Sequence, residues 1–166
     1  MSGHIRAGLR GALVFASMFV FSLAACSENQ PQNGGQGVVN SIEKLVNAAL
    51  SGESAGKIDL AKLSGFEWDR LFIYAPYTPA STIEKELRLV DPVVRDIGID
   101  ARDDVSLLVF MRFDQVAKAV AYPRGKGDFS MAGAENPIPR QRSRFIVVDS
   151  PEDKGWPQLE WVGAVD

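Results

Sequence analysis

Apolar residues are grouped in two different ways along the first fifty positions of the chain. Residues 11–25 are mostly apolar and follow Arg6 and Arg10, the charged-then-apolar order of an export signal. With about fifteen residues, the segment is shorter than the roughly 20 that a membrane-spanning helix requires. From Val38 to Leu50 the apolar residues recur at helical spacing, and Ser51-Gly52 can end a helix there. The pattern predicts a removable export signal followed by an amphipathic helix.

The next apolar run, from Phe66 to Ala75, alternates in a way that predicts a strand. One expected face carries most of the aromatic side chains, Phe66, Trp68, Phe72 and Tyr74, together with Arg70. Leu71 and Ile73 would lie on the opposite face. Because a strand that is apolar on both faces is usually covered on both sides, we expect this one to be interior.

A helix is predicted to follow this strand and to end near Val90. It would begin either at Thr78, with a proline in the first helical position, or at Ser81, which starts a capping box. Its buried side would hold Ile83, Leu87 and Val90, and Glu84 would pair with Arg88 on the surface. Asp91-Pro92 predicts a further short helical turn, which Gly98 ends.

Alternating apolar positions return in the second half and predict four more strands. Their ranges are Val105 to Phe113, Val116 to Tyr122, Arg144 to Asp149 and Leu159 to Val165, with Asp114-Gln115 as a turn between the first two. Ala117, Ala119 and Ala121 would line one side of the second strand and leave shallow space for a helix. The whole pattern predicts a single α+β domain, with a mainly antiparallel sheet of four to five strands and helices on one face.

The apolar segment at the N-terminus ends in Leu23-Ala24-Ala25-Cys26, where small residues precede the only cysteine of the chain. This resembles the signal of bacterial lipoproteins, in which the cysteine is acylated and becomes residue one of the mature protein. A plain secretory signal cleaved after Ala25 is the alternative, but it would leave an unpaired thiol in an exported domain. We therefore expect a signal peptide over 1–25, a lipidated Cys26, and the α+β domain over 38–166.

Residues 27–37 include no aliphatic or aromatic side chain and are rich in Gln, Asn and Gly, which is typical of a flexible tether. Ser27 follows the cysteine directly, and the residue at this position, serine or aspartate, is associated with the membrane to which a lipoprotein is sorted. In Gram-negative bacteria serine at this position is associated with sorting to the outer membrane. We expect the lipid on Cys26 to hold the protein at the bacterial cell membrane, and at the outer membrane facing the periplasm if the host is Gram-negative.

Charge and residue types narrow the chemistry of the mature domain. The chain has 18 basic and 21 acidic residues, and the signal removes Arg6 and Arg10, so no global basic field favours nucleic acid. His4, the sole histidine, is removed as well. Catalysis by Ser-His-Asp or Cys-His groups and zinc ligation by His or Cys are thus excluded from the mature domain. We expect a protein that is not an enzyme and that needs no cofactor.

Acidic pairs elsewhere do not change this expectation. Asp103-Asp104 with Asp100, and Glu152-Asp153, lack the ligand spacing of an EF-hand loop. We interpret them as solvated charges and predict no metal site.

Two short motifs, Phe66-Glu67-Trp68-Asp69 and Pro76-Tyr77-Thr78, lie close together in the chain. The run from Phe66 to Ile83 resembles small, uncharacterised bacterial lipoproteins that share this Trp-Asp and Pro-Tyr-Thr signature. In that group the signature precedes a helix and a pair of apolar strands follows. This chain departs from the group at Leu87-Arg88-Leu89, where such helices usually end on Leu-Gly. The resemblance implies a fold and export, and it implies no chemistry.

The candidate binding residues are of the types that dominate binding hot spots. They are Tyr77, Trp68, Arg70, Arg124 and Arg140. Tyr77 lies between two prolines, which would preorganise its ring. Arg124 and Arg140 belong to a long irregular, net basic stretch between Tyr122 and Arg144, and loops of this length are usually functional or disordered. The alternative is structural, with Trp68 in the core and the basic residues paired with acidic ones inside the fold.

These observations lead to a first hypothesis and two alternatives. The first is a lipid-anchored, non-catalytic binding or accessory module for an envelope protein, a cell-wall component or a lipid surface. The second is a histidine-free hydrolase of cell wall or glycan, which would need two close carboxylates in a cleft. The third is an inhibitor lipoprotein that blocks a cell-wall enzyme with the long loop.

Overall fold

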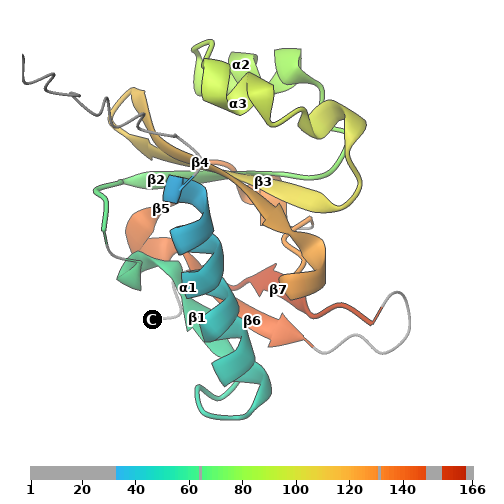
Figure 1. Ribbon diagram of the computed structural model, residues 1–166. Coiled ribbons are helices and arrows are strands. Elements are labelled where there is room, and N and C mark those ends of the chain that lie inside the picture. Colours follow the sequence, from blue (N-terminus) through green and yellow to red (C-terminus); the bar gives the residue numbers. More distant parts are fainter. Residues whose placement is uncertain (1–32, 64, 131, 149–154, 164–166) are drawn as a thin grey trace, which may run out of the picture.

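The strands that the alternating positions predict divide between two antiparallel sheets. The computed structural model describes residues 33–63, 65–130, 132–148 and 155–163 (Figure 1). A four-stranded sheet has the order β4-β3-β2-β5, and a three-stranded sheet has the order β1-β6-β7. With three α-helices in the described part of the chain, this confirms the expected α+β class. The strands do not form the single sheet that we expected.

The four-stranded sheet is built around β3 (Val105–Arg112), the most apolar strand. It lies between β2 (Arg70–Tyr74) and β4 (Gln115–Pro123), and β5 (Ile138–Pro139) pairs with the other side of β2. Every residue of β3 except Arg112 is buried. Because successive side chains of a strand point to opposite faces, both faces of this sheet must be covered.

One face of the sheet is covered by α1 (Asn33–Leu50). Its apolar stripe includes Val39, Ile42 and Val46, which share a core with Leu108 and Phe110 of β3. The helix begins at Asn33, five residues earlier than expected, so residues 33–37 are helical and do not belong to a tether. The three-stranded sheet lies on the same side, below the four-stranded sheet in Figure 1.

The opposite face is covered by α2 (Ala80–Leu87) and α3 (Pro92–Asp96), as Figure 1 shows. Ile83, Leu87 and Val94 pack against Leu107 and the other residues on that side of β3. Helices therefore cover both faces, and the expectation of helices on one face is wrong. The reason is that β3 has apolar side chains on both faces, so each face must be packed against other elements.

The ends of α2 also differ from the prediction. The Thr78 hydroxyl donates to the carbonyl of Ala75 at the end of β2, and no side chain caps the helix. The helix ends at Leu87 because Arg88 adopts a left-handed conformation, which leaves Val90 exposed. Glu84 pairs with Arg95 of α3, where Arg88 was expected.

Two registers are shifted relative to the sequence pattern. Since β2 begins only at Arg70, Trp68 leaves the alternation and packs on the side of Leu71, away from Phe72 and Tyr74. The β3–β4 turn consists of Phe113 and Asp114, because Arg112 pairs with Gln115. Phe113 is 71% exposed and has a φ of 52°, an unusual conformation for an aromatic residue.

The three-stranded sheet packs against the same core as α1. It consists of β1 (Lys57–Asp59), β6 (Arg144–Val148) and β7 (Gln158–Trp161). Phe129 joins the two sheets because its ring lies 5.3 Å from that of Tyr122 on β4 and 5.2 Å from that of Phe145 on β6, both edge-on. The stretch after Tyr122 is therefore a packed part of the core, where a functional or disordered loop was expected.

The short strand β5 pairs only with Arg70 and Leu71, and other residues occupy the edge of β2 after them. The side-chain amide of Asn136 accepts from the N–H of Ile73 and donates to its carbonyl, both at 2.8 Å, as a neighbouring strand would. Gly133 lies against the same strand, and a Cβ there would be 2.6 Å from the Ile73 carbonyl oxygen. This side of the sheet cannot accept another strand without displacing these residues.

We expect Gly133→Ala to destabilise the domain by about 2 kcal/mol, because the methyl group would push backbone against backbone. Gly37→Ala is the matched control, since a Cβ at that position meets nothing within 4 Å and alanine favours the helix by up to about 1 kcal/mol. Urea unfolding of the two variants measures both effects. Equal stability of the two variants would contradict the close approach at Ile73.

Candidate functional site

The five residues predicted to form one binding surface lie at two opposite ends of the four-stranded sheet. Trp68, Arg70 and Arg140 lie where β2 begins, beside the β3–β4 turn. Tyr77 follows the end of β2, and Arg124 follows the end of β4. Since β4 runs parallel to β2 across the intervening β3, Tyr77 and Arg124 share one end of the sheet. The structure does not bring the five residues together.

At the first end, the candidate residues hold the fold together. Trp68 is buried and packs edge-on against Phe110 at 5.1 Å. The Arg140 guanidinium lies 5.3 Å from the Trp68 ring and donates to the carbonyl of Ala61 at 3.0 Å. Arg70 donates to the carboxylate of Asp114 at 3.1 Å. The burial of Trp68 agrees with its structural alternative, whereas Arg140 is held by backbone carbonyls and the Trp68 ring, where an acidic partner was the alternative considered.

At the other end, Arg124 forms a mostly buried ion pair. Its guanidinium donates to the carboxylate of Asp128 at 2.6 Å and to the carbonyl of Asp103 at 2.9 Å, and it lies 5.2 Å from the Trp156 ring. Only 14% of the Arg124 side chain and 2% of the Asp128 side chain is exposed. Burial alone would raise the pKa of Asp128, but hydrogen bonds from Arg124 and Ser130 bring it below its ordinary value.

Three cations of the basic stretch, Arg124, Lys126 and Arg144, pair with acidic side chains of the fold. Lys126 pairs with Glu43 of α1 at 2.7 Å, and Arg144 approaches Asp59 at 3.7 Å. The guanidinium of Arg142 lies 5.2 Å from the Trp161 ring. The partners therefore come from the loop itself, from α1 and from β1. The acidic pair Glu152-Asp153, interpreted above as solvated charges, lies outside the described residues.

Tyr77 is the one candidate whose side chain faces solvent, with 60% of it exposed. Its φ is 63°, and its N–H donates to the carbonyl of Ile99 at 3.0 Å. A bulky residue in the left-handed region is uncommon and is often found at functional positions. Tyr77 remains a candidate contact residue, but Arg124 beside it is engaged with Asp128.

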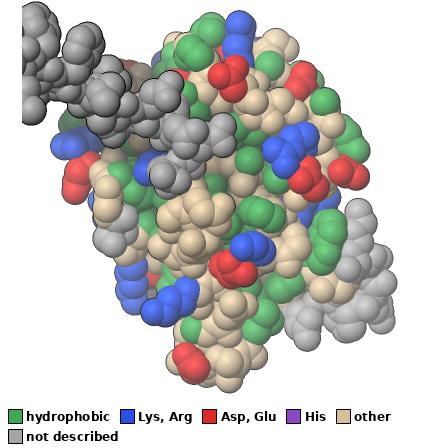
Figure 2. All heavy atoms as spheres, viewed as in Figure 1, with side chains coloured by type: hydrophobic (Ala, Val, Ile, Leu, Met, Phe, Trp, Pro, Cys, Tyr) green, Lys and Arg blue, Asp and Glu red, His purple; other side chains and the backbone are tan. Residues whose placement is uncertain are grey.

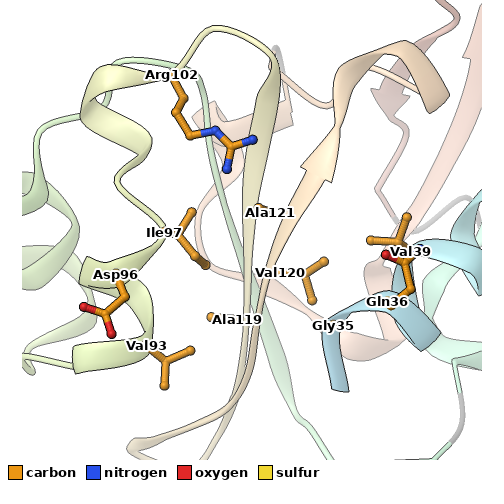
Figure 3. Close-up of a pocket in the computed structure, with 10 residues that line it drawn as sticks. All are labelled: Gly35, Gln36, Val39, Val93, Asp96, Ile97, Arg102, Ala119, Val120 and Ala121. Atoms are coloured by element: carbon orange, nitrogen blue, oxygen red, sulfur yellow. The ribbon is translucent and has the colours of Figure 1, made fainter. Parts of the chain in front are cut away.

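A groove of about 440 Å³ lies elsewhere, along β4 (Figure 3). Three consecutive residues of this strand line it, Ala119, Val120 and Ala121. Neighbouring residues of a strand point to opposite faces, so a hollow that touches all three runs along the strand's edge. Among the described residues, β4 pairs only with β3, which leaves this edge open.

Two helices form the walls of the groove, one from each face of the sheet. In Figure 3, the first turns of α1 lie on one side of β4, and α3 with the turn after it lies on the other. Gly35, Gln36 and Val39 come from α1, and the apolar Val93 and Ile97 come from the opposite side. Asp96 and Arg102 add charge at the rim, and Arg102 is bound through two hydrogen bonds to Asp104.

Sequence reasoning found one part of this groove. The alanine row was expected to leave shallow space for a helix, and Ala119 and Ala121 do pack against the cluster that includes Val94 of α3. The local pattern could not show that β4 is an edge strand of the sheet. That position depends on the order of the strands, which is set by contacts far apart in the sequence.

Other kinds of site find no counterpart in the described part of the chain. No group of three His, Cys, Asp or Glu side chains there could hold a metal ion. No helix among these residues is long and apolar enough to cross a membrane. Figure 2 shows acidic and basic side chains interspersed with hydrophobic ones over the face in view.

Comparison with known proteins gives no further assignment. No protein family, curated protein or solved structure matches the chain. The function is therefore inferred from the groove and from the sequence.

We expect Arg124→Ala to lower the free energy of unfolding by about 3–5 kcal/mol, because it leaves the Asp128 charge buried without its partner. The matched control is Arg102→Ala, which breaks an exposed pair and should cost at most about 1 kcal/mol. Urea unfolding at neutral pH measures both. A small effect at Arg124 would mean that this residue is free to serve as a binding residue.

The same ion pair makes stability depend on pH in a defined direction. Because the pKa of Asp128 is lowered in the folded state, its contribution is present above the ordinary carboxyl pKa, near 4, and is lost as the pH falls through the folded value. The stability difference between wild type and Asp128→Asn should therefore shrink in acid. A difference that stays constant down to pH 2 would contradict the lowered pKa.

Proposed function

We propose that the protein is a lipid-anchored protein of the bacterial cell envelope whose α+β domain acts without catalysis, as a binding or accessory module. The observation that carries the proposal is the groove along the open edge of β4, between walls from α1 and α3, with the apolar Val93 and Ile97 on one wall. Ligand sites are mostly concave and apolar, with a few polar groups. This groove has that character.

The position of the groove relative to the anchor supports the proposal. Asn33, where α1 begins, follows Cys26 by seven residues. Even a fully extended chain of that length spans at most about 25 Å. Because Gly35 and Gln36 line the groove, a lipid on Cys26 would keep it close to the membrane surface. The module would therefore capture partners in the layer next to the bilayer.

The two alternatives receive less support from the geometry. Among the described residues that line the groove there is one carboxylate, Asp96, whereas a glycoside hydrolase needs a pair. An inhibitory loop would have to be free to enter a foreign active site. The long stretch after Tyr122 is held by Phe129 and Ile138, both buried in the core. We therefore favour the binding module.

We expect the wild-type protein to incorporate labelled palmitate in its host and to sediment with membranes, and Cys26→Ser to do neither. Ser27→Asp is the matched control, because it keeps the cysteine and changes only the sorting residue. This variant should keep the label and, in a Gram-negative host, move to the inner membrane. Labelling of Cys26→Ser would contradict lipidation at this position.

We expect a photo-crosslinking amino acid at Val93 to capture one dominant envelope partner in living cells. Val93 lines the groove and is 49% exposed, so the substitution should not disturb the core. The same substitution at Val90, which is 60% exposed and lies outside the groove, is the control and should give background adducts only. Mass spectrometry of the adducts decides the outcome, and identical patterns from the two positions would overturn the proposal.

A further inference from the structure

We infer that the groove binds an extended peptide segment of a partner protein, which adds to the four-stranded sheet as a strand along β4. This inference rests on the proposed binding function and names the class of ligand. Strand addition uses the backbone groups of an open edge for affinity and the flanking pockets for specificity. Both parts are present at this edge.

The two edges of the four-stranded sheet are treated differently. On the outer side of β2, the strand β5, the Asn136 amide and Gly133 occupy the edge. On the outer side of β4, no described strand or side-chain amide takes that place, and the groove runs there. An unpaired edge is a template for another strand, so proteins usually cover it. Leaving one edge open while closing the other points to a use for the open one.

The unpaired backbone N–H and C=O groups of β4 favour a peptide over an acyl chain as the ligand of the groove. Peptide N–H and C=O groups that are buried must find hydrogen-bond partners. An acyl chain in the groove would cover these groups and offer none, at a cost of a few kcal/mol for each group. A peptide strand satisfies them. A second copy of this chain is disfavoured, because its own β4 lies between its own α1 and α3, and the walls of the two copies would meet.

The walls indicate which peptide fits. Val93 and Ile97 line one side of β4, and Gly35 and Gln36 line the other. Side chains of an added strand therefore meet apolar surface on the α3 side and a small and a polar residue on the α1 side. At the rim, the exposed carboxylate of Asp96 favours a basic residue at the end of the segment, whereas Arg102 already has its carboxylate in Asp104. We expect a short run of small or branched apolar residues flanked by Lys or Arg.

The test uses the lipidated mature protein, which begins at Cys26, in lipid nanodiscs. It is mixed with a panel of fluorescent peptides that have Lys at both ends and Val, Ala, Leu or Phe between. Each binding peptide is also made in two N-methylated forms, in which alternate amides are blocked. In an added strand only one set of N–H groups faces β4, so one form should bind at least about tenfold more weakly and the other nearly as well as the parent. Equal binding of both forms would overturn the inference.

Two variants locate the binding. Val93→Asn should weaken peptide binding at least about tenfold, because it replaces an apolar wall residue with a polar amide, and Val90→Asn should change binding by less than about twofold. Failure of the whole panel while Val93 still crosslinks a partner would overturn strand addition and leave the proposed function standing. Failure of both experiments would overturn both. A protein that dimerises through β4 and excludes every peptide would also contradict the inference.

Discussion

The fold depends on one mostly buried ion pair, between Arg124 and Asp128. Arg124 is fixed to the start of β3, since its backbone N–H donates to the carbonyl of Asp104 and its guanidinium donates to that of Asp103. Asp128 is fixed to the other sheet, because its N–H donates to the carbonyl of Pro157 and its own carbonyl accepts from Leu159. The 2.6 Å contact between the two side chains therefore joins the four-stranded and three-stranded sheets.

Around this pair the two sheets share a single core, and that core positions the groove. Phe129, the residue after Asp128, is packed between Tyr122 of β4 and Phe145 of β6. Lys126 of the same turn holds α1 through Glu43. The helix that forms one wall of the groove is thus tied to the junction that joins the sheets. A partner in the groove would contact a wall that is already fixed, which lowers the entropic cost of binding.

Sequence reasoning succeeded where the periodicity is local and failed where long-range contacts decide. The alternation in β3 and β4 predicted both strands, and Asp91 with Pro92 predicted α3. Trp68 was assigned to the wrong face because β2 begins at Arg70, four residues later than predicted, where pairing with Met111 sets the register. The hot-spot residues Arg124 and Arg140 were chosen by residue type, and residue type does not show that Asp128 and Trp68 occupy them. The open edge of β4 was not predictable, since it follows from the order of the strands.

An open strand edge needs protection against uncontrolled pairing, and β4 has two features that provide it. Its edge is recessed between α1 and α3, so a flat sheet from another molecule cannot approach it as it could approach an uncovered strand. Lys118, next to Ala119 on the same strand, carries a charge, with its ammonium 5.0 Å from the Phe66 ring. Lysine on edge strands is a common means of discouraging aggregation. The same two features that exclude a sheet leave room for a single strand, so protection and selectivity have one structural origin.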